Sequence, residues 1–384
     1  MDLLMDSLLS FLTYVLPFLT ILTVIVFVHE LGHYVAARYN DVRVEVFSIG
    51  FGYELFGYTD RHGTRWKFSA IPLGGYVKMF GEVDIVDISA KGGCLLPAED
   101  RAAAFRYKRL SQRAVIIAAG PAMNFIFAVL VFTLVFMTLG QPITPPVVGE
   151  VKTGSAAAVA GILPGDRFVS IDGQPIEQFS DIQQSVQLSN GAPIEVRLWR
   201  EEAELAFIIT PHITERIDHL GNIRRVPVLG VTMNPSEPTK IQRHTPLSAL
   251  KQAIRETYEV TRTALIAFGQ MLIGARETDE LSGILRIAHF SGLAVKGGVS
   301  IVVTFIAILS INLGLVNLFP IPLLDGGHLL YYAIEGVRRR PLSERTQEYG
   351  LRIGLILVFG LLIFATWNDL VQLGVWDFFT GLIS

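Results

Sequence analysis

The chain contains one cysteine and few charged residues for its length of 384 residues. Because Cys94 stands alone, neither a disulfide within the chain nor a zinc cluster of several thiolates can form. Charged residues make up 17% of the chain, against about 25% in an average soluble protein. The net charge of -3 gives no reason to expect nucleic acid as a partner. Apolar residues take the place of the missing charge and reach 51%.

The N-terminus also lacks the basic residues that begin a secretory signal peptide. Residues 1–10, MDLLMDSLLS, contain two Asp but neither Lys nor Arg. The apolar run that follows shows no small-residue cleavage pattern. We therefore expect a retained transmembrane helix here rather than a cleaved leader.

The apolar residues gather in long runs, and a helix of about 20 residues crosses the hydrocarbon core of a bilayer. The sequence therefore predicts a polytopic α-helical membrane protein with about four transmembrane helices. A fifth run, at about 246–273, mixes apolar with charged residues, which is typical of an amphipathic helix on a membrane surface. The four expected spans lie at about 9–37, 114–139, 299–319 and 353–373.

Basic residues close to these runs predict the orientation of the chain, because cytoplasmic loops carry an excess of Lys and Arg. The loops after the first and third spans have such clusters, and residues 1–9 and 377–384 have none. We therefore expect both termini, and the region 145–235, outside the cytoplasm. The basic clusters are Arg101, Arg106, Lys108, Arg109 and Arg113 after the first span, and Arg338, Arg339, Arg340, Arg345 and Arg352 after the third.

The first span ends in the sequence His-Glu-Leu-Gly-His, from His29 to His33. Residues i and i+4 share a helix face, so the two imidazoles can bind one zinc ion. Glu30 is placed to orient and deprotonate a zinc-bound water. The plainer alternative is a pair of interfacial histidines, but ionisable groups in a membrane span are costly and usually functional.

A catalytic zinc usually has three protein ligands, and no third one follows closely on His33. Asp325 is a candidate, because Pro320 and Pro322 break the third span just before it. The alternative is an Asp that caps the next helix, expected to start near Gly327. His328 is a rival ligand, which we expect to face the cytoplasmic loop.

Five motifs together resemble the site-2 protease family of intramembrane zinc metalloproteases, most closely its bacterial RseP type, the regulator of sigma-E proteases. They occur in the family's order and cover nearly the whole chain. The motifs are HELGH (29–33), SIGFG (48–52), IPLGGYVKM (71–79), AGPAMNF (119–125) and NLFPIPLLDGGH (317–328).

The resemblance implies one zinc ion per chain on His29, His33 and Asp325, with Glu30 as the general base. It gives Asn317 a substrate contact and supports a re-entrant β-hairpin or sheet built from the second and third motifs. Gly50 and Gly52 of that hairpin are candidate substrate contacts. It also implies a bacterial inner-membrane protease whose substrates are single-span proteins, such as a pre-trimmed anti-sigma factor or remnant signal peptides.

The region 145–235 resembles the PDZ domains of bacterial proteases. Its turns at Pro164-Gly165-Asp166 and Asp172-Gly173 flank an expected strand, 167–171. An α+β domain of this kind recognises protein tails by strand addition, or acts as a plug that excludes bulky substrates. The chain then divides into an N-terminal membrane part (1–144), a PDZ-like domain (145–235) and a C-terminal membrane part (236–384).

Two other classes of protein compete with the protease. A non-enzymatic membrane adaptor would display the PDZ-like domain and keep a structural zinc, but such a site has no need of Glu30 beside its ligand. A metal transporter is disfavoured, because the second and fourth spans hold no His, Asp or Glu apart from Asp369 at an end.

Overall fold

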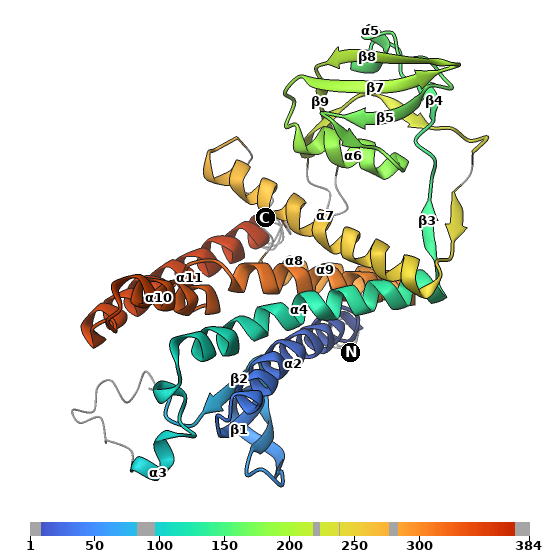
Figure 1. Cartoon of the computed structure of the whole chain (residues 1–384). Helices are drawn as coiled ribbons and strands as arrows, with labels where there is room; N and C mark the ends of the chain where they lie inside the picture. Colours follow the sequence, from blue (N-terminus) through green and yellow to red (C-terminus); the bar gives the residue numbers. More distant parts are fainter. Residues whose placement is uncertain (1–8, 83–96, 218–222, 238, 276–282, 373–384) are drawn as a thin grey trace, which may run out of the picture. The chain divides into compact units, whose positions relative to one another are not determined.

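The computed structural model describes residues 9–82, 97–217, 223–237, 239–275 and 283–372. Cys94 therefore lies outside the described residues. The chain forms two compact units (Figure 1). Unit 1 comprises Met1–Thr133, Gln252–Thr261 and Ser282–Asp369, and unit 2 comprises Leu134–Lys251, Arg262–Leu281 and Leu370–Ser384.

Four helices in the described part are long and apolar enough to cross a membrane, as the sequence predicts. The first consists of the π-helical turn η1 (Phe11–Val15) and the helix α2 (Leu16–Tyr39). The others are α4 (Leu110–Thr138), α9 (Val299–Asn317) and α11 (Glu344–Gln372). The shorter helices of unit 1 are α3 (Ala98–Arg101), η3 (Phe105–Tyr107), α8 (Ile284–Lys296) and α10 (Asp325–Arg338).

Helices α2 and α4 pack closely because glycine stands where they touch. A Cβ atom at Gly32 would lie 2.2 Å from the carbonyl oxygen of Ala119. A Cβ atom at Gly120 would lie 2.2 Å from Nε2 of His33. Small residues let two helix backbones approach closely in a membrane, so these glycines bring α4 against the histidine face of α2.

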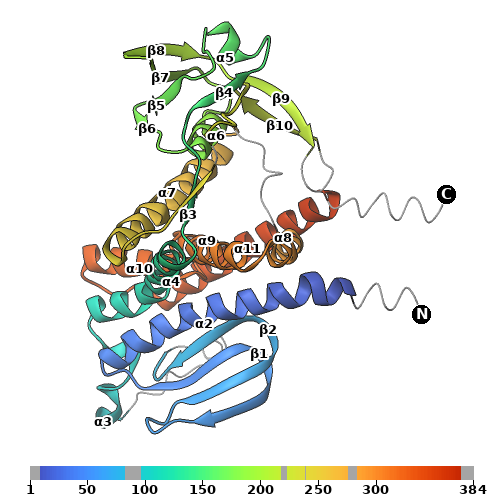
Figure 2. The same ribbon diagram turned by 90° about the vertical axis from the view of Figure 1, so that its right-hand side faces the viewer.

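The strands β1 (Val44–Thr59) and β2 (Arg65–Met79) form a long antiparallel hairpin that lies along α2 (Figure 2). Both strands bend, so that Phe47 is paired with Val77 and also with Trp66. The base of the hairpin packs into a core with α2 and α4. That core contains Ala37, Val42, Val44, Phe47, Val77, Met79, Phe105, Ile116 and Ile117.

Helix α9 ends at Asn317, two residues before the expected end of the span, because Pro320 and Pro322 follow. Leu323 has a φ of 103°, an unusual value for a residue with a side chain, and α10 then begins. The expected start near Gly327 is wrong by two residues, since α10 starts at Asp325. The first turn of α10 can pack against the preceding segment because Gly326 and Gly327, which have no side chain, lie against backbone atoms of residues 318–322.

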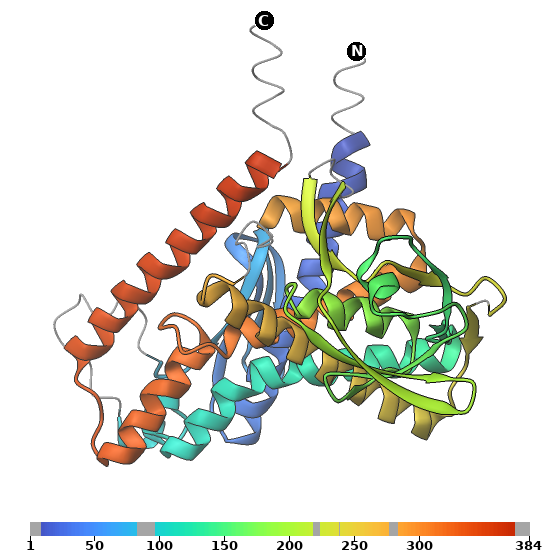
Figure 3. The same cartoon turned by 90° about the horizontal axis from the view of Figure 1, so that it is seen from above.

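Helix α11 runs back from the end of α10 (Figure 3, in red) and ends at Gln372, with Asp369 in its last turn. The carboxylate of Asp369 is fully buried and accepts hydrogen bonds from the backbone N–H groups of Gly283 (2.9 Å) and Arg286 (3.0 Å). It therefore caps the N-terminus of α8 from another helix. This structural role accounts for Asp369, the acidic residue near the C-terminal end of the fourth span.

Unit 2 contains a four-stranded sheet with the order β6-β5-β7-β8. Asp172 and Gly173 both have positive φ, as an Asp-Gly hairpin turn requires between β5 and β6. Asp166, buried beside this sheet, accepts two hydrogen bonds of 2.8 Å from Arg200. The sheet strands are β5 (Arg167–Ile171), β6 (Gln174–Pro175), β7 (Ile194–Arg200) and β8 (Ala203–Ile209).

The remaining strands of unit 2 form three antiparallel pairs. The apolar core of the unit lies between the four-stranded sheet, the helices α5 (Ala156–Val159) and α6 (Phe179–Leu188), and the pair β4–β11. The pairs are β3 (Gln141–Ile143) with β12 (Lys240–Gln242), β4 (Val148–Val151) with β11 (Val231–Met233), and β9 (His212–Ile217) with β10 (Ile223–Val228). Helix α7 (Pro246–Leu272) joins the two units in sequence.

Candidate metal centre

The histidine face of α2 is buried although it belongs to a membrane-spanning helix. His29 is 7% exposed and His33 is 6% exposed. Their Nε2 atoms lie 3.2 Å apart, as expected for residues one helical turn apart with both rings pointing the same way.

Asp325, at the first position of α10, brings its carboxylate to the same point. Its Oδ2 atom lies 3.1 Å from Nε2 of His29 and 3.5 Å from Nε2 of His33. These residues form a group of three candidate metal ligands within the described part of the chain. The N-cap position of α10 belongs to Leu324, so Asp325 does not cap the helix in the way the alternative supposed.

The three distances fit a zinc ion. Ligands held tetrahedrally at about 2.0–2.1 Å from zinc lie about 3.3 Å from one another. The observed separations of 3.1, 3.2 and 3.5 Å scatter around that value. In addition, Oδ2 of Asp325 is buried, and no group in the described chain donates a well-aligned hydrogen bond to it. The residues present therefore suit a metal ion that would satisfy this oxygen.

Residues of helix α4 contact the Nδ1 atoms of both imidazoles. Nδ1 of His33 lies 2.9 Å from the carbonyl oxygen of Ile116, so this nitrogen donates its proton there and leaves Nε2 free as a ligand. Nδ1 of His29 lies 3.2 Å from the side-chain amide of Asn124. Sequence reasoning missed both contacts, although Asn124 lies in the fourth of the five motifs.

Glu30, the residue that follows His29, also lies against the β1–β2 hairpin. Its carboxylate lies close to the backbone of Val77 on β2. A Cβ atom at Gly75 would lie 3.2 Å from Cγ of Glu30, so only glycine lets the strand come this close. The part of β2 around Gly75 thus lies beside the side chain expected to act as the base, a contact that sequence reasoning also missed.

The residues expected to contact the substrate do not belong to the group of three candidate ligands. Asn317 is the last residue of α9, and its side chain makes no hydrogen bond or ion pair with another described residue. Gly50 and Gly52 lie in β1 and both have a φ of 86°, which favours glycine. His328 lies on α10, is exposed, and does not belong to the group of three ligands.

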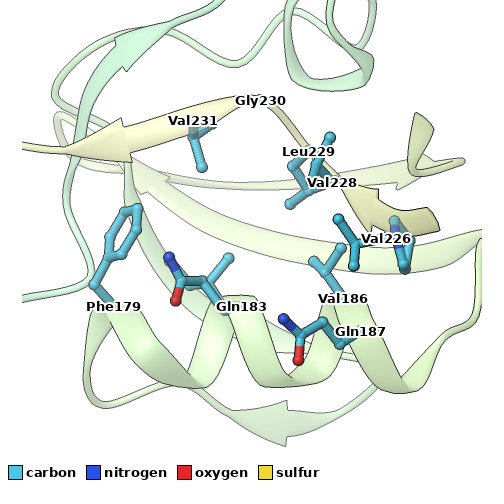
Figure 4. Close-up of a pocket in the computed structure, with 11 residues that line it drawn as sticks. Phe179, Gln183, Val186, Gln187, Val226, Val228, Leu229, Gly230 and Val231 are labelled. Carbon is cyan, nitrogen blue, oxygen red and sulfur yellow. The ribbon is translucent and has the colours of Figure 1, made fainter. Parts of the chain in front are cut away.

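Unit 2 has a separate groove between α6 and the residues that join β10 to β11 (Figure 4). Its lining is mostly apolar and carries no charged side chain. β11 pairs with β4 along one edge, and no described strand pairs with the other edge. The groove is lined by Phe179, Ile182, Gln183, Val186, Gln187 and residues 226–231.

The sequence of this chain is similar to those of bacterial metalloproteases along almost its whole length. It is 44% identical to a protein of Agrobacterium fabrum over 367 residues, which cover 95% of this chain and 97% of that protein. It is 42% identical to a protein of Rhizobium meliloti over 369 residues, covering 95% and 99%. Both are named as zinc metalloproteases. It is 37% identical to Metalloprotease MmpA of Caulobacter vibrioides over 398 residues, covering 98% and 100%.

Among solved structures, the PDZ domain of an SdrC-like protein from Listeria monocytogenes covers 24% of this chain and 88% of that domain. The identity is 19% and the TM-score 0.19, a score too low to define a fold.

Four helices able to span a membrane, together with two histidines and a carboxylate around one point, define a membrane-embedded metalloprotease. The sequence model of Peptidase family M50 matches residues 17–361, and the chain belongs to this family of site-2 proteases. The membership favours the enzyme over a non-enzymatic adaptor, and the names of the relatives imply zinc as the metal.

Proposed function

We propose that this protease cuts within the transmembrane segments of single-span membrane proteins, at one zinc ion held by His29, His33 and Asp325. The observation that carries the proposal is the convergence of these three side chains, at 3.1 to 3.5 Å, beside Glu30 and within the helical part of the chain. A site placed there is reached by substrates that lie in the membrane rather than by soluble proteins.

The residues around the site have separate tasks in peptide hydrolysis. When bound, zinc supplies Lewis-acid chemistry that polarises the scissile carbonyl and lowers the pKa of a water molecule. Glu30 accepts the proton of the attacking water as a new C–O bond forms. Glu30 then returns this proton to the amide nitrogen as the C–N bond breaks. Ile116 and the other contacts of α4 keep the imidazoles facing the metal.

The β1–β2 hairpin supplies a backbone edge for the substrate in this proposal. A helical substrate hides its amides in internal hydrogen bonds, so its cleavage site must unwind, and a strand edge can hold the opened segment. The part of β2 around Gly75 and Val77 touches Glu30 and is well placed for this pairing. Several apolar side chains near the bend of the hairpin are exposed, which suits a hairpin that enters the membrane. They include Phe51, Tyr53, Leu55, Phe56, Ile71 and Leu73.

The location and the partners of the protease follow from its charge pattern and its family. We propose a multi-pass protein of the bacterial inner membrane with both termini outside the cytoplasm, in contact with the lipid bilayer. Its substrates are pre-trimmed single-span proteins, for instance an anti-sigma factor, or remnant signal peptides. The PDZ-like domain, 145–235, either binds protein tails along the free edge of β11 or excludes bulky substrates.

The experiment that tests this function compares cells carrying the native protease with cells carrying Glu30→Gln. Quantitative proteomics of the membrane fraction should show transmembrane fragments that accumulate only with the variant. These fragments should disappear when the native protease is restored. An unchanged set of membrane fragments, with the variant present at the normal level, would contradict intramembrane cleavage.

A further inference from the structure

The two zinc-facing histidines meet the same helix on the opposite side of their rings. His33 uses the backbone carbonyl of Ile116, and His29 uses the side-chain amide of Asn124, at 3.2 Å. Asn124 is completely buried within a helix that is otherwise strongly apolar. A buried amide is costly in such surroundings, so its position calls for a reason other than packing.

The direction of the hydrogen bond between Asn124 and His29 decides which nitrogen can bind metal. A neutral imidazole carries its proton on one nitrogen and a lone pair on the other. If the amide NH₂ of Asn124 donates to Nδ1, then Nε2 carries the proton and cannot be a ligand. If Nδ1 donates to the amide oxygen, Nε2 presents its lone pair towards Asp325 and His33.

The second arrangement needs only a rotation of the amide about its last bond, which exchanges Oδ1 and Nδ2 without moving other atoms. No other contact opposes this rotation, because Oδ1 has no hydrogen-bond partner in the described chain. The contact with His29 therefore sets the orientation of the amide, and a metal ion on Nε2 selects the form in which Oδ1 accepts.

Contacts with α9 hold Asn124 itself in place. The hydroxyl of Ser310 donates a hydrogen bond of 3.0 Å to the backbone carbonyl of Asn124. A Cβ atom at Gly314 would lie 3.1 Å from Cβ of Asn124, so α9 packs directly against this residue. These contacts fix the backbone position of Asn124, from which its side-chain amide orients the imidazole of His29.

We infer that Asn124 is a positioning residue whose amide oxygen accepts the Nδ1 proton of His29 and so keeps Nε2 of His29 available to the metal. The inference rests on the zinc site proposed above. It assigns to α4 the control of both imidazoles, through a backbone carbonyl at His33 and a side-chain amide at His29. Outer partners of this kind typically contribute 10- to 100-fold to metal affinity.

The test measures metal binding to the full-length chain, purified in detergent and freed of metal. Zinc affinity is determined by competition with a chelating dye, and the absorption bands of added Co²⁺ report on the ligand geometry. Asn124→Leu removes the acceptor but keeps the size of the side chain, and Asn124→Asp keeps an oxygen acceptor. Thr133→Val is the matched control, because it removes a polar group from the same helix, where the hydroxyl of Thr133 donates a hydrogen bond to the carbonyl of Val129 and does not touch His29 or Asn124.

We expect Asn124→Leu to bind zinc 10- to 100-fold more weakly and to show altered Co²⁺ bands. Asn124→Asp and Thr133→Val should bind zinc about as tightly as the native chain. A native affinity in Asn124→Leu, or an equal loss in Asn124→Leu and Asn124→Asp, would overturn the inference. If Asn124→Leu does not fold, Asn124→Asp still decides, since its acceptor must preserve the site. Failure of the native chain to bind zinc would instead refute the proposed zinc site.

Discussion

Arg113, near the start of α4, and Glu335, in α10, form an ion pair in unit 1, with Nη2 of Arg113 3.2 Å from Oε2 of Glu335. The other carboxylate oxygen of Glu335 accepts a hydrogen bond of 3.0 Å from the backbone N–H of Leu342. Glu335 is only 6% exposed. The pair joins the helix that begins with Asp325 to the helix that supports both histidines, so it helps to keep the third ligand in place.

Loss of the charge on Glu335 should therefore lower both the stability of the folded protein and the affinity of its metal site. Glu335→Gln leaves the guanidinium of Arg113 without its charged partner, and a hydrogen bond to a charged group contributes about 1.5–3 kcal/mol. We expect a lower midpoint of thermal unfolding in detergent and weaker zinc retention. The double variant Arg113→Met with Glu335→Leu should recover part of the stability, because apolar residues can replace a buried pair. A double variant less stable than Glu335→Gln would contradict this role.

Glu30→Gln should keep zinc and lose proteolysis. The amide can still hydrogen-bond to a water molecule but cannot take its proton, and loss of a general base typically costs 10²–10⁴-fold in rate. Zinc content and cleavage of a single-span substrate are measured on the same purified sample. Glu45→Gln makes the same chemical change on β1, in an ion pair with Lys78, and should leave both unchanged. Full activity of zinc-loaded Glu30→Gln would contradict the proposed mechanism.

Asp325→Asn should lose both zinc and activity. A carboxylate binds zinc at about 2.0–2.2 Å and offsets its charge, whereas a neutral amide is a poorer ligand. A residue that only capped α10 would tolerate the change, because Asn caps a helix as well as Asp does. Asp41→Asn is a suitable control, since Asp41 is exposed and its φ of 54° is one that Asn adopts readily. Zinc stoichiometry near one per chain in Asp325→Asn would leave the third ligand unidentified.

Removal of the PDZ-like domain should leave the cutting of short substrates intact. Ile143 of β3 is paired with Lys240 of β12, so the two chain segments that flank the domain lie side by side. A short Gly/Ser linker can therefore replace 145–235. We expect this variant to cut a substrate already shortened outside the membrane and also to admit the untrimmed substrate. Loss of cleavage of the short substrate by a folded variant would show that the domain takes part in catalysis.

Much of the architecture follows from local chemistry. Apolar runs of about 20 residues have few stable forms other than membrane helices, so four spans could be read directly. His29, Glu30 and His33 belong to one helical turn, whose geometry places the two imidazoles together without help from the rest of the chain. The Asp-Gly turn at Asp172 is likewise set by the conformations that its two residues allow.

Other features depend on segments far apart in the chain. The sequence offered Asp325 as a third ligand but could not decide between a ligand and a helix cap, nor give the true start of α10. Whether Asp325 acts as a ligand or as a cap depends on how Gly326 and Gly327 pack against the non-helical residues 318–322 that precede them. The contacts of Asn124 with His29 and of Gly75 with Glu30 show no periodicity in the sequence, because each forms only when different elements pack together. The sequence by itself thus determined the spans and the histidine pair, whose geometry is local. Only the tertiary structure decided which distant carboxylate, amide and strand edge surround them, because side chains that meet through packing leave no local pattern.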